Sequence, residues 1–236
     1  MDAGKYVFAK PYLGWLLTGA GNTLLISLLS GLFALAAGML LAAAGTGGRK
    51  TPMPVKLYTD VFRNIPVVPM LLLLSFGLPY LFRRYLGFSF PPGMDFLLVV
   101  TGLSLNTAAY ISEILRAGLN GLPEEQYEAG ITLGLGKHRT FFLILLPQAF
   151  RISFPALATR LIHNMKNSSV ALVLPLNLNR MELMGQTSRI AGQTFAWAEP
   201  LLFSAAVYLV LALGLSAALN RVSVVVNRKV NANEYS

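Results

Sequence analysis

The sequence predicts an all-α integral membrane protein with about five transmembrane helices and short helices outside the membrane. Hydrophobic residues make up 55% of the chain and charged residues only 12%, about half of the roughly 25% found in soluble domains. Between Pro11 and Gly48 there is no acidic or basic side chain. Runs of this length form helices that cross about 30 Å of hydrocarbon, whereas the strands of a membrane barrel would give short alternating segments.

Five apolar stretches are the expected spans, within a single domain of residues 1–236: 14–44, 57–82, 95–119, 141–171 and 198–226. Basic residues and prolines interrupt the fourth stretch: Arg151, Arg160, His163, Lys166, Pro147 and Pro155. The prolines are expected to bend or end its helix. Other protein segments are expected to cover this backbone, because lipid cannot satisfy the carbonyl groups that a proline frees.

The positive charge of the chain is typical of loops that face anionic lipid. The net charge is +9, but the basic residues are scattered between apolar runs, which does not favour nucleic-acid binding. With five spans, three basic segments fall on one side: Arg49, Lys50 and Lys56; Arg116, Lys137 and Arg139; Arg221, Arg228 and Lys229. The positive-inside tendency makes that side the cytoplasm and places the N-terminus outside. Arg83 and Arg84 fall on the opposite side and weaken the bias.

The loop at residues 121–140, between the third and fourth spans, has the pattern of a short helix. Pro123 suits the first helical position, and the acidic residues after it favour the positive end of a helix dipole. Gly134 and Gly136 are expected to end the helix, and a second one is expected to begin near Lys137. Tyr127, Ile131 and either Ala129 or Gly130 recur at helical spacing and leave a face of small residues. Physics alone leaves two alternatives open, a docking site for another protein and an amphipathic helix on the headgroups.

This loop resembles the EAA loop of ATP-binding cassette importer permeases. The resemblance is carried by Glu128, Ala129 and Gly130, then Gly134, then the Ile-x-Leu-Pro sequence at residues 144–147. It implies a type I ABC importer permease fold in which the loop enters a cleft of a cytoplasmic ATPase. Tyr127, Glu128, Ala129, Gly130, Ile131 and Gly134 would then form the coupling surface. Gly130 stands where the family usually has a second alanine.

Further segments resemble the histidine, glutamine and glutamate group of polar amino acid permeases: GNTL at residues 21–24, VFRNIP at 61–66, AAYISE at 108–113 and KNSS at 166–169. The resemblance implies a bacterial inner-membrane protein. Its implied partners are two ATP-binding subunits, a second permease subunit that is identical or homologous, and an extracytoplasmic amino-acid-binding protein. ATP and magnesium would be bound by the partner ATPase and no cofactor by this chain.

Ionisable residues at membrane depth need partners or water, because burying a charge there is costly. Glu113 is expected to form an ion pair within the protein or a link to the second subunit. Arg116 is expected to extend toward the headgroups. Arg63 and Asn64 are expected to line the substrate path, although a structural role for Arg63 near its helix end remains open.

A dense polar run lies near the middle of the fourth span: Asn164, Lys166, Asn167, Ser168 and Ser169. Lys166 could meet a substrate carboxylate, with the neighbouring amide and hydroxyls holding the remaining polar groups. An equally open alternative is a polar lining between two subunits without substrate contact. Many related permeases have aspartate where this chain has Asn167, so the missing negative charge favours acidic amino acids, or a broad polar range, over cationic ones.

No catalytic residue is expected, because the chain has no Gly-x4-Gly-Lys-Ser/Thr segment to hold ATP phosphates. Two other classes of function remain as alternatives. A channel or secondary transporter would use the same intramembrane polar residues without the coupling loop. A membrane-embedded enzyme would need clustered acids or metal ligands, but His138 and His163 lack ligand spacing and no metal site is expected.

Overall fold

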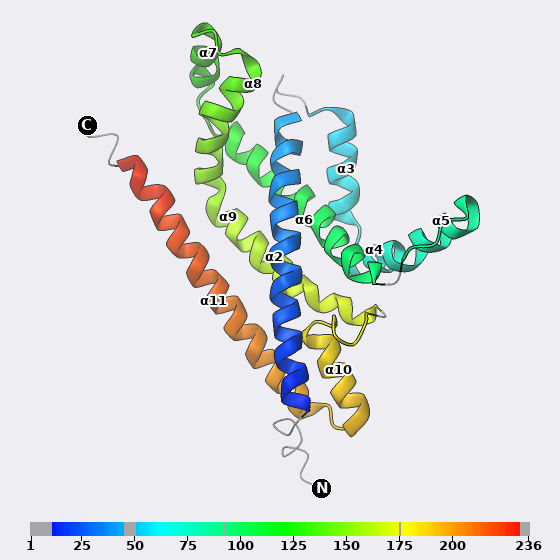
Figure 1. Cartoon of the computed structure of the whole chain (residues 1–236). Helices are drawn as coiled ribbons and strands as arrows, with labels where there is room; N and C mark the ends of the chain where they lie inside the picture. The colour runs from blue at the N-terminus through cyan, green and yellow to red at the C-terminus, as the bar shows by residue number, and fades with distance from the viewer. Residues whose placement is uncertain (1–10, 45–50, 92, 175, 232–236) are drawn as a thin grey trace. The chain divides into compact units, whose positions relative to one another are not determined.

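The computed structural model describes residues 11–44, 51–91, 93–174 and 176–231, with side chains as far as residue 224, and this part of the chain contains helices and no strand (Figure 1). The α-helices are α2 (Tyr12–Ala44), α3 (Met53–Asn64), α4 (Val67–Leu72), α5 (Leu78–Leu86), α6 (Met94–Asn120), α7 (Glu124–Thr132), α8 (Gly136–Thr140), α9 (Leu146–Asn167), α10 (Leu183–Thr194) and α11 (Ala198–Asn231). Two π-helical turns, η1 (Leu73–Gly77) and η2 (Phe141–Leu145), and one 3-10 helix, η3 (Ser168–Val173), complete the set.

Five helical stretches within the described residues are long and apolar enough to cross a membrane: Tyr12–Ala44, Val67–Leu86, Met94–Asn120, Gly136–Val173 and Ala198–Val224. The prediction of an all-α protein with about five spans is therefore confirmed. The second span differs from the expected 57–82, because α3 ends at Asn64 and a new helix begins at Val67. Pro66 explains the break, since it has no N–H to donate and disfavours helical geometry at Ile65.

Two prolines inside spans are accommodated by π-helical turns that come just before them. Pro79 follows η1 and Pro147 follows η2, each as the second residue of the next α-helix. The wider turn gives room where a proline ring would otherwise clash with the carbonyl one turn earlier. Pro155 lies inside α9, and the helix continues through it to Asn167. Neither Pro147 nor Pro155 ends the fourth span.

The chain divides into two compact units, and α2, α6, α9 and α11 each contribute residues to both. Unit 1 comprises residues 1–32, 65–104 and 163–214, and unit 2 comprises residues 33–64, 105–162 and 215–236. Contacts within each unit give it a core of its own. The expectation of a single domain stays a prediction.

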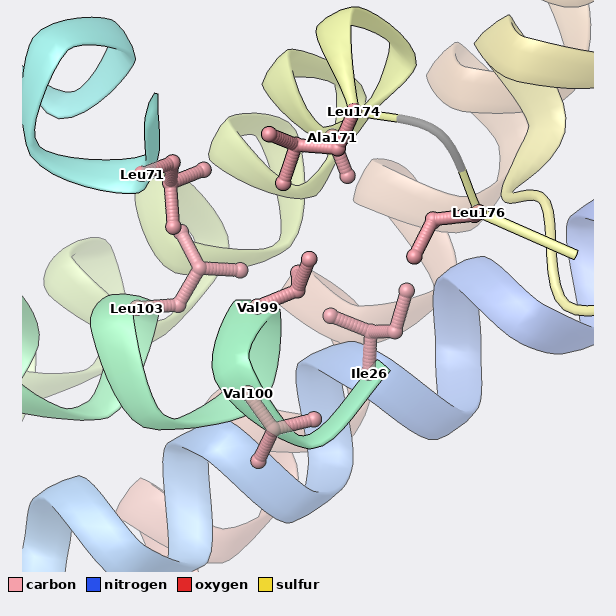
Figure 2. Close-up of a cluster of buried hydrophobic side chains, with 8 residues drawn as sticks. All are labelled: Ile26, Leu71, Val99, Val100, Leu103, Ala171, Leu174 and Leu176. Atoms are coloured by element: carbon pink, nitrogen blue, oxygen red, sulfur yellow. The ribbon is translucent and has the colours of Figure 1, made fainter. Parts of the chain in front are cut away.

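The main core of unit 1 gathers aliphatic side chains from α2, α4, α6 and the chain around η3. Its buried members are Ile26, Leu71, Val99, Val100, Leu103, Ala171, Leu174 and Leu176. In Figure 2, Leu71 meets Leu103, and Ile26, Val99 and Leu176 point toward one another. Gly102 brings α6 close to Leu71, because a Cβ built there would lie 2.6 Å from the Leu71 Cδ2. Deleting a large member of such a core typically costs about 2–5 kcal/mol.

A second cluster in unit 1 packs α10 against α2 and α11. Leu16, Leu183 and Ile190 are its buried members, and Val207 and Tyr208 pack against them. Gly19 allows the close approach, because a Cβ there would lie 2.8 Å from the Leu183 Cα. The start of α10 is thus fixed by packing.

Unit 2 uses small residues on α2 to let α6 approach. Ala34, Gly38 and Ala42 follow at intervals of four residues, and both alanines are buried. A Cβ at Gly38 would lie 2.5 Å from the Ile111 Cγ2. Small residues at this spacing are a common means of packing helices in membranes. Ala108, Ile111, Leu115 and Leu157 complete this core.

Candidate functional site

The expected coupling loop is a pair of short helices in unit 2. α7 begins at Glu124, directly after Pro123, so the proline precedes the first helical residue instead of occupying it. After α7 the chain turns through Gly134 (φ 77°), and α8 begins at Gly136 (φ 69°). Backbone bonds from Gly134 N to Ile131 O (2.9 Å) and from Leu135 N to Gly130 O (3.2 Å) close the turn. Glycine is favoured at both positions because other residues rarely adopt a positive φ.

Gly130 faces inward and the other members of the motif do not. It is buried against Thr140 of α8, whose side chain a Cβ at this position would overlap. Glu128 and Ala129 are exposed, Ile131 is 39% exposed and Tyr127 is half-buried. The small residue therefore holds the two helices together, while its neighbours present the outer surface.

Sequence reasoning missed Leu133, which is 77% exposed at the end of α7. Leu133 comes after Ile131 in the sequence and does not belong to the three- and four-residue spacing of the motif residues. Single exposed leucines are common on protein surfaces, so no signal in the sequence marks this residue.

In unit 2, Arg63 and Glu113 form an ion pair at 3.4 Å between Nη1 and Oε2. Arg116 hydrogen-bonds Glu113, one turn away on α6, and also Thr51 before α3. The expected ion pair of Glu113 is therefore present within the chain. These two partners hold the guanidinium of Arg116, and the expectation that it extends toward the headgroups stays a prediction. The ion pair gives Arg63 a partner within the chain, while Asn64 is exposed and donates to the Asp60 carbonyl at 2.7 Å. The expectation that both residues line the substrate path stays a prediction.

Arg160 is stabilised by neutral groups of α6. It donates to Asn106 Oδ1 (2.5 Å) and Thr107 Oγ1 (3.2 Å), and its guanidinium lies 3.8 Å from the centre of the Tyr110 ring. Asn106 also donates to the Phe62 carbonyl at 2.6 Å. Hydrogen bonds and a cation–π contact are a means of keeping a charge in an apolar surrounding. These partners were not anticipated, because nothing in their local sequence marks them.

The polar run in the fourth span divides between two faces of its helix. Asn164 is 1% exposed and donates to Ser30 Oγ at 2.7 Å, and Ser168 is fully buried and donates to the Met165 carbonyl. These two residues, four positions apart, face the interior of unit 1. Lys166 is exposed and Ser169 is partly exposed, three positions apart on another face. Asn167 is half-buried between the two faces.

Lys166 and Ser169 line an open groove of about 250 Å³ in unit 1, with Tyr208, Leu209 and Ala212 of α11. The groove combines one cationic group, a hydroxyl and an apolar wall. Ligand sites commonly have this composition, with a few polar groups among apolar ones. Sequence reasoning identified Lys166 and Ser169 and missed the α11 residues, about forty positions further along the chain.

Comparison with known proteins identifies the class of protein that this fold belongs to. Residues 34–232 match the family described as binding-protein-dependent transport system inner membrane component. The chain belongs to this family, whose members work with ATP-binding and substrate-binding partners. Its five candidate spans agree with a multi-pass protein of the inner membrane.

Individual relatives narrow the class to amino-acid permeases. The arginine transport system permease protein ArtQ of Bacillus subtilis (strain 168) is 34% identical, with 95% of this chain and 96% of the relative covered. A putative glutamine transport system permease protein, GlnP of Rickettsia felis, is 30% identical, with 87% and 90% covered. The chain is a permease subunit of an amino-acid ATP-binding cassette importer.

Solved structures show the same fold. A crystal structure of an amino acid ABC transporter with histidines matches at a TM-score of 0.70 and 27% identity, covering 90% of this chain and 94% of that one. An inward-facing MetNI methionine ABC transporter matches at a TM-score of 0.71 and 21% identity, covering 93% and 99%. These matches support the type I importer permease fold that the EAA loop implies.

Proposed function

We propose that this chain forms the translocation path of an importer for polar amino acids, with a preference for glutamate and aspartate. It works with two ATP-binding subunits, a second permease subunit and an extracytoplasmic binding protein. The N-terminus lies outside and the C-terminus in the cytoplasm. Part of the support for this orientation, Arg49 and Lys50, lies outside the described residues.

In the proposal, energy enters through the coupling loop. ATP and magnesium are bound by the partner ATPase, and this chain has no ATPase site. Closure of the ATPase dimer on ATP moves the loop, and the spans rock to open outward until hydrolysis resets them. The two glycine turns and the close contact between Gly130 and Thr140 support this role, because a movement is transmitted only through a stiff element. Glu128, Ala129, Ile131 and Leu133 form the docking surface, with Tyr127 at its edge and Gly134 holding the turn.

The groove at Lys166 is the observation that carries the substrate assignment. Its charged lining residue is a lysine, and an ammonium attracts the carboxylate of an amino acid and repels a cationic side chain. Ser169 adds a hydroxyl within the same groove, and Asn167, next to Lys166 in the sequence, is half-buried outside the groove lining. Asn164 and Ser168 support the groove from within, and Arg63 and Asn64 belong to the path through unit 2.

The test is uptake of labelled glutamate, aspartate, glutamine and arginine into proteoliposomes that hold the complete complex. Wild type is compared with Lys166→Ala, and with Lys56→Ala as a control that removes an exposed lysine of α3. The proposal expects acidic substrates to be preferred and Lys166→Ala to reduce their uptake more than that of arginine. Preference for arginine in wild type, unchanged by Lys166→Ala, would contradict the acidic assignment.

A further inference from the structure

Tyr208 joins the groove to a buried network behind it. The residue lines the groove, and its hydroxyl donates to Glu182 Oε2 at 2.6 Å. The hydroxyls of Thr23 and Ser168 also interact with it. The orientation of a tyrosine side chain is set by its two χ angles and by the partner of its hydroxyl. The position of the Glu182 carboxylate therefore helps to set the orientation of the Tyr208 ring.

Glu182 is held by the first turn of α10. Its carboxylate is fully buried and accepts from Met184 N at 2.7 Å and Gly185 N at 2.6 Å, capping the helix. The neighbouring Leu183 N donates to Thr23 Oγ1 at 3.1 Å, which attaches the same turn to α2. Moving the carboxylate would leave the half-buried N–H of Met184 and the buried N–H of Gly185 without acceptors. The partner of the Tyr208 hydroxyl is therefore fixed in space.

Attachment of α10 to α11 does not depend on this bond alone. Thr187 of α10 and Ser204 of α11 are both buried and hydrogen-bond each other. That pair joins the same two helices without touching the groove. It serves as a matched control, because losing it loosens the helices and leaves the hydroxyl of Tyr208 in place.

We propose that Glu182 is a positioning residue of the substrate groove, which holds Tyr208 through its hydroxyl so that the ring forms a fixed wall beside Leu209 and Ala212. This inference rests on the proposed function of the groove. Lys166 then meets a carboxylate of the amino acid, and the fixed wall packs against its aliphatic part. A loosened tyrosine would widen the groove and lower the affinity for every amino acid that uses this wall.

The experiment measures equilibrium binding of labelled amino acid to the purified complex without its binding protein. Glu182→Gln and Tyr208→Phe are each expected to raise the dissociation constant about three- to tenfold, because binding must then order the loosened tyrosine side chain. Glutamine has a single acceptor oxygen for the three groups that donate to Glu182, so Glu182→Gln weakens the bond that Tyr208→Phe removes. The double variant is therefore expected to bind no more weakly than Tyr208→Phe alone. Ser204→Ala is expected to lower the thermal stability and leave the dissociation constant unchanged.

The outcomes separate this inference from the function of the groove. Equal loss of affinity in Ser204→Ala and Glu182→Gln, or additive losses in the double variant, would overturn the positioning role. If Lys166→Ala weakens binding while Glu182→Gln and Tyr208→Phe do not, the groove stands and the inference fails. Binding that none of these variants changes, or no binding by wild type, would reject the groove and the inference together.

Discussion

The polar residues of the fourth span differ in how deeply they are buried and in which groups they contact. Asn164 is satisfied inside unit 1 by Ser30, whereas Lys166, two positions later, reaches the groove. The first is part of the packing, and the second is available to a ligand. Burial and partners therefore divide a run that sequence reasoning treated as one site.

Asn164→Ala is expected to lower the free energy of unfolding by about 1–3 kcal/mol, because the Ser30 hydroxyl loses its buried partner. Lys166→Ala is expected to change stability by less than about 0.5 kcal/mol and to weaken substrate binding. Thermal unfolding of the purified complex and binding of labelled amino acid measure the two effects. Weakened binding in Asn164→Ala without loss of stability would show that this residue contacts substrate.

The buried carboxyl group of Glu182 is expected to make the stability of the protein depend on pH. Burial raises the pKa of its carboxyl to about 7, while hydrogen bonds from Tyr208, Met184 and Gly185 oppose the shift. In the unfolded chain the pKa returns to about 4.3, so folding is most favoured below that value and loses stability as the pH rises toward about 7. The shift corresponds to a loss on the order of 3 kcal/mol.

Thermal unfolding at several pH values between 4.5 and 8 measures this slope. Glu182→Gln, which has no titrating group at this position, is expected to lose less stability than wild type over the same range. Identical slopes in the two proteins would contradict a raised pKa for Glu182.

At the scale of elements, the coupling loop depends on one close contact between two short helices. Gly130 and Thr140 bring α7 and α8 together, and the usual alanine of the family pattern would not fit beside this threonine. Glycine at position 130, where the family usually has alanine, therefore leaves the space that the Thr140 side chain fills. The threonine could not be linked to Gly130 from the sequence, because the link depends on the turn at Gly134 and Gly136.

Gly130→Ala is expected to destabilise the loop by about 1–3 kcal/mol through overpacking. Thr140→Ala removes the atoms that the new methyl group would overlap, so adding it to Gly130→Ala should restore most of the loss. Hydrogen exchange of the α7 amides, measured in the complex, reports the change. Equal protection in wild type and Gly130→Ala would show that the two helices are not held by this contact.

At the scale of the whole molecule, the spans and the coupling loop were predictable because residues close together in the sequence specify each of them. Long apolar runs define the spans, and the glycine positions define the loop. The Glu182–Tyr208 bond was not predictable, since it joins single residues of separate helices and no motif marks either one. Thr51 was missed as a partner of Arg116 for a related reason: it lies just before α3, and the hydropathy pattern does not show where that helix begins.

The central claim is that ATP drives transport through the outer surface of the coupling loop. Leu133→Glu places a charge on that surface, and Leu178→Glu is a control, since it adds the same charge at an exposed leucine outside the spans and the coupling loop. The measurement is uptake of labelled amino acid into proteoliposomes with and without ATP, together with the amount of ATPase bound to each variant.

The account predicts that wild type and Leu178→Glu take up substrate only with ATP. Leu133→Glu should lose at least about tenfold of that uptake together with its bound ATPase, because the introduced carboxylate would be buried without a partner. Equal uptake with and without ATP in wild type, or full ATP-driven uptake by Leu133→Glu, would contradict it.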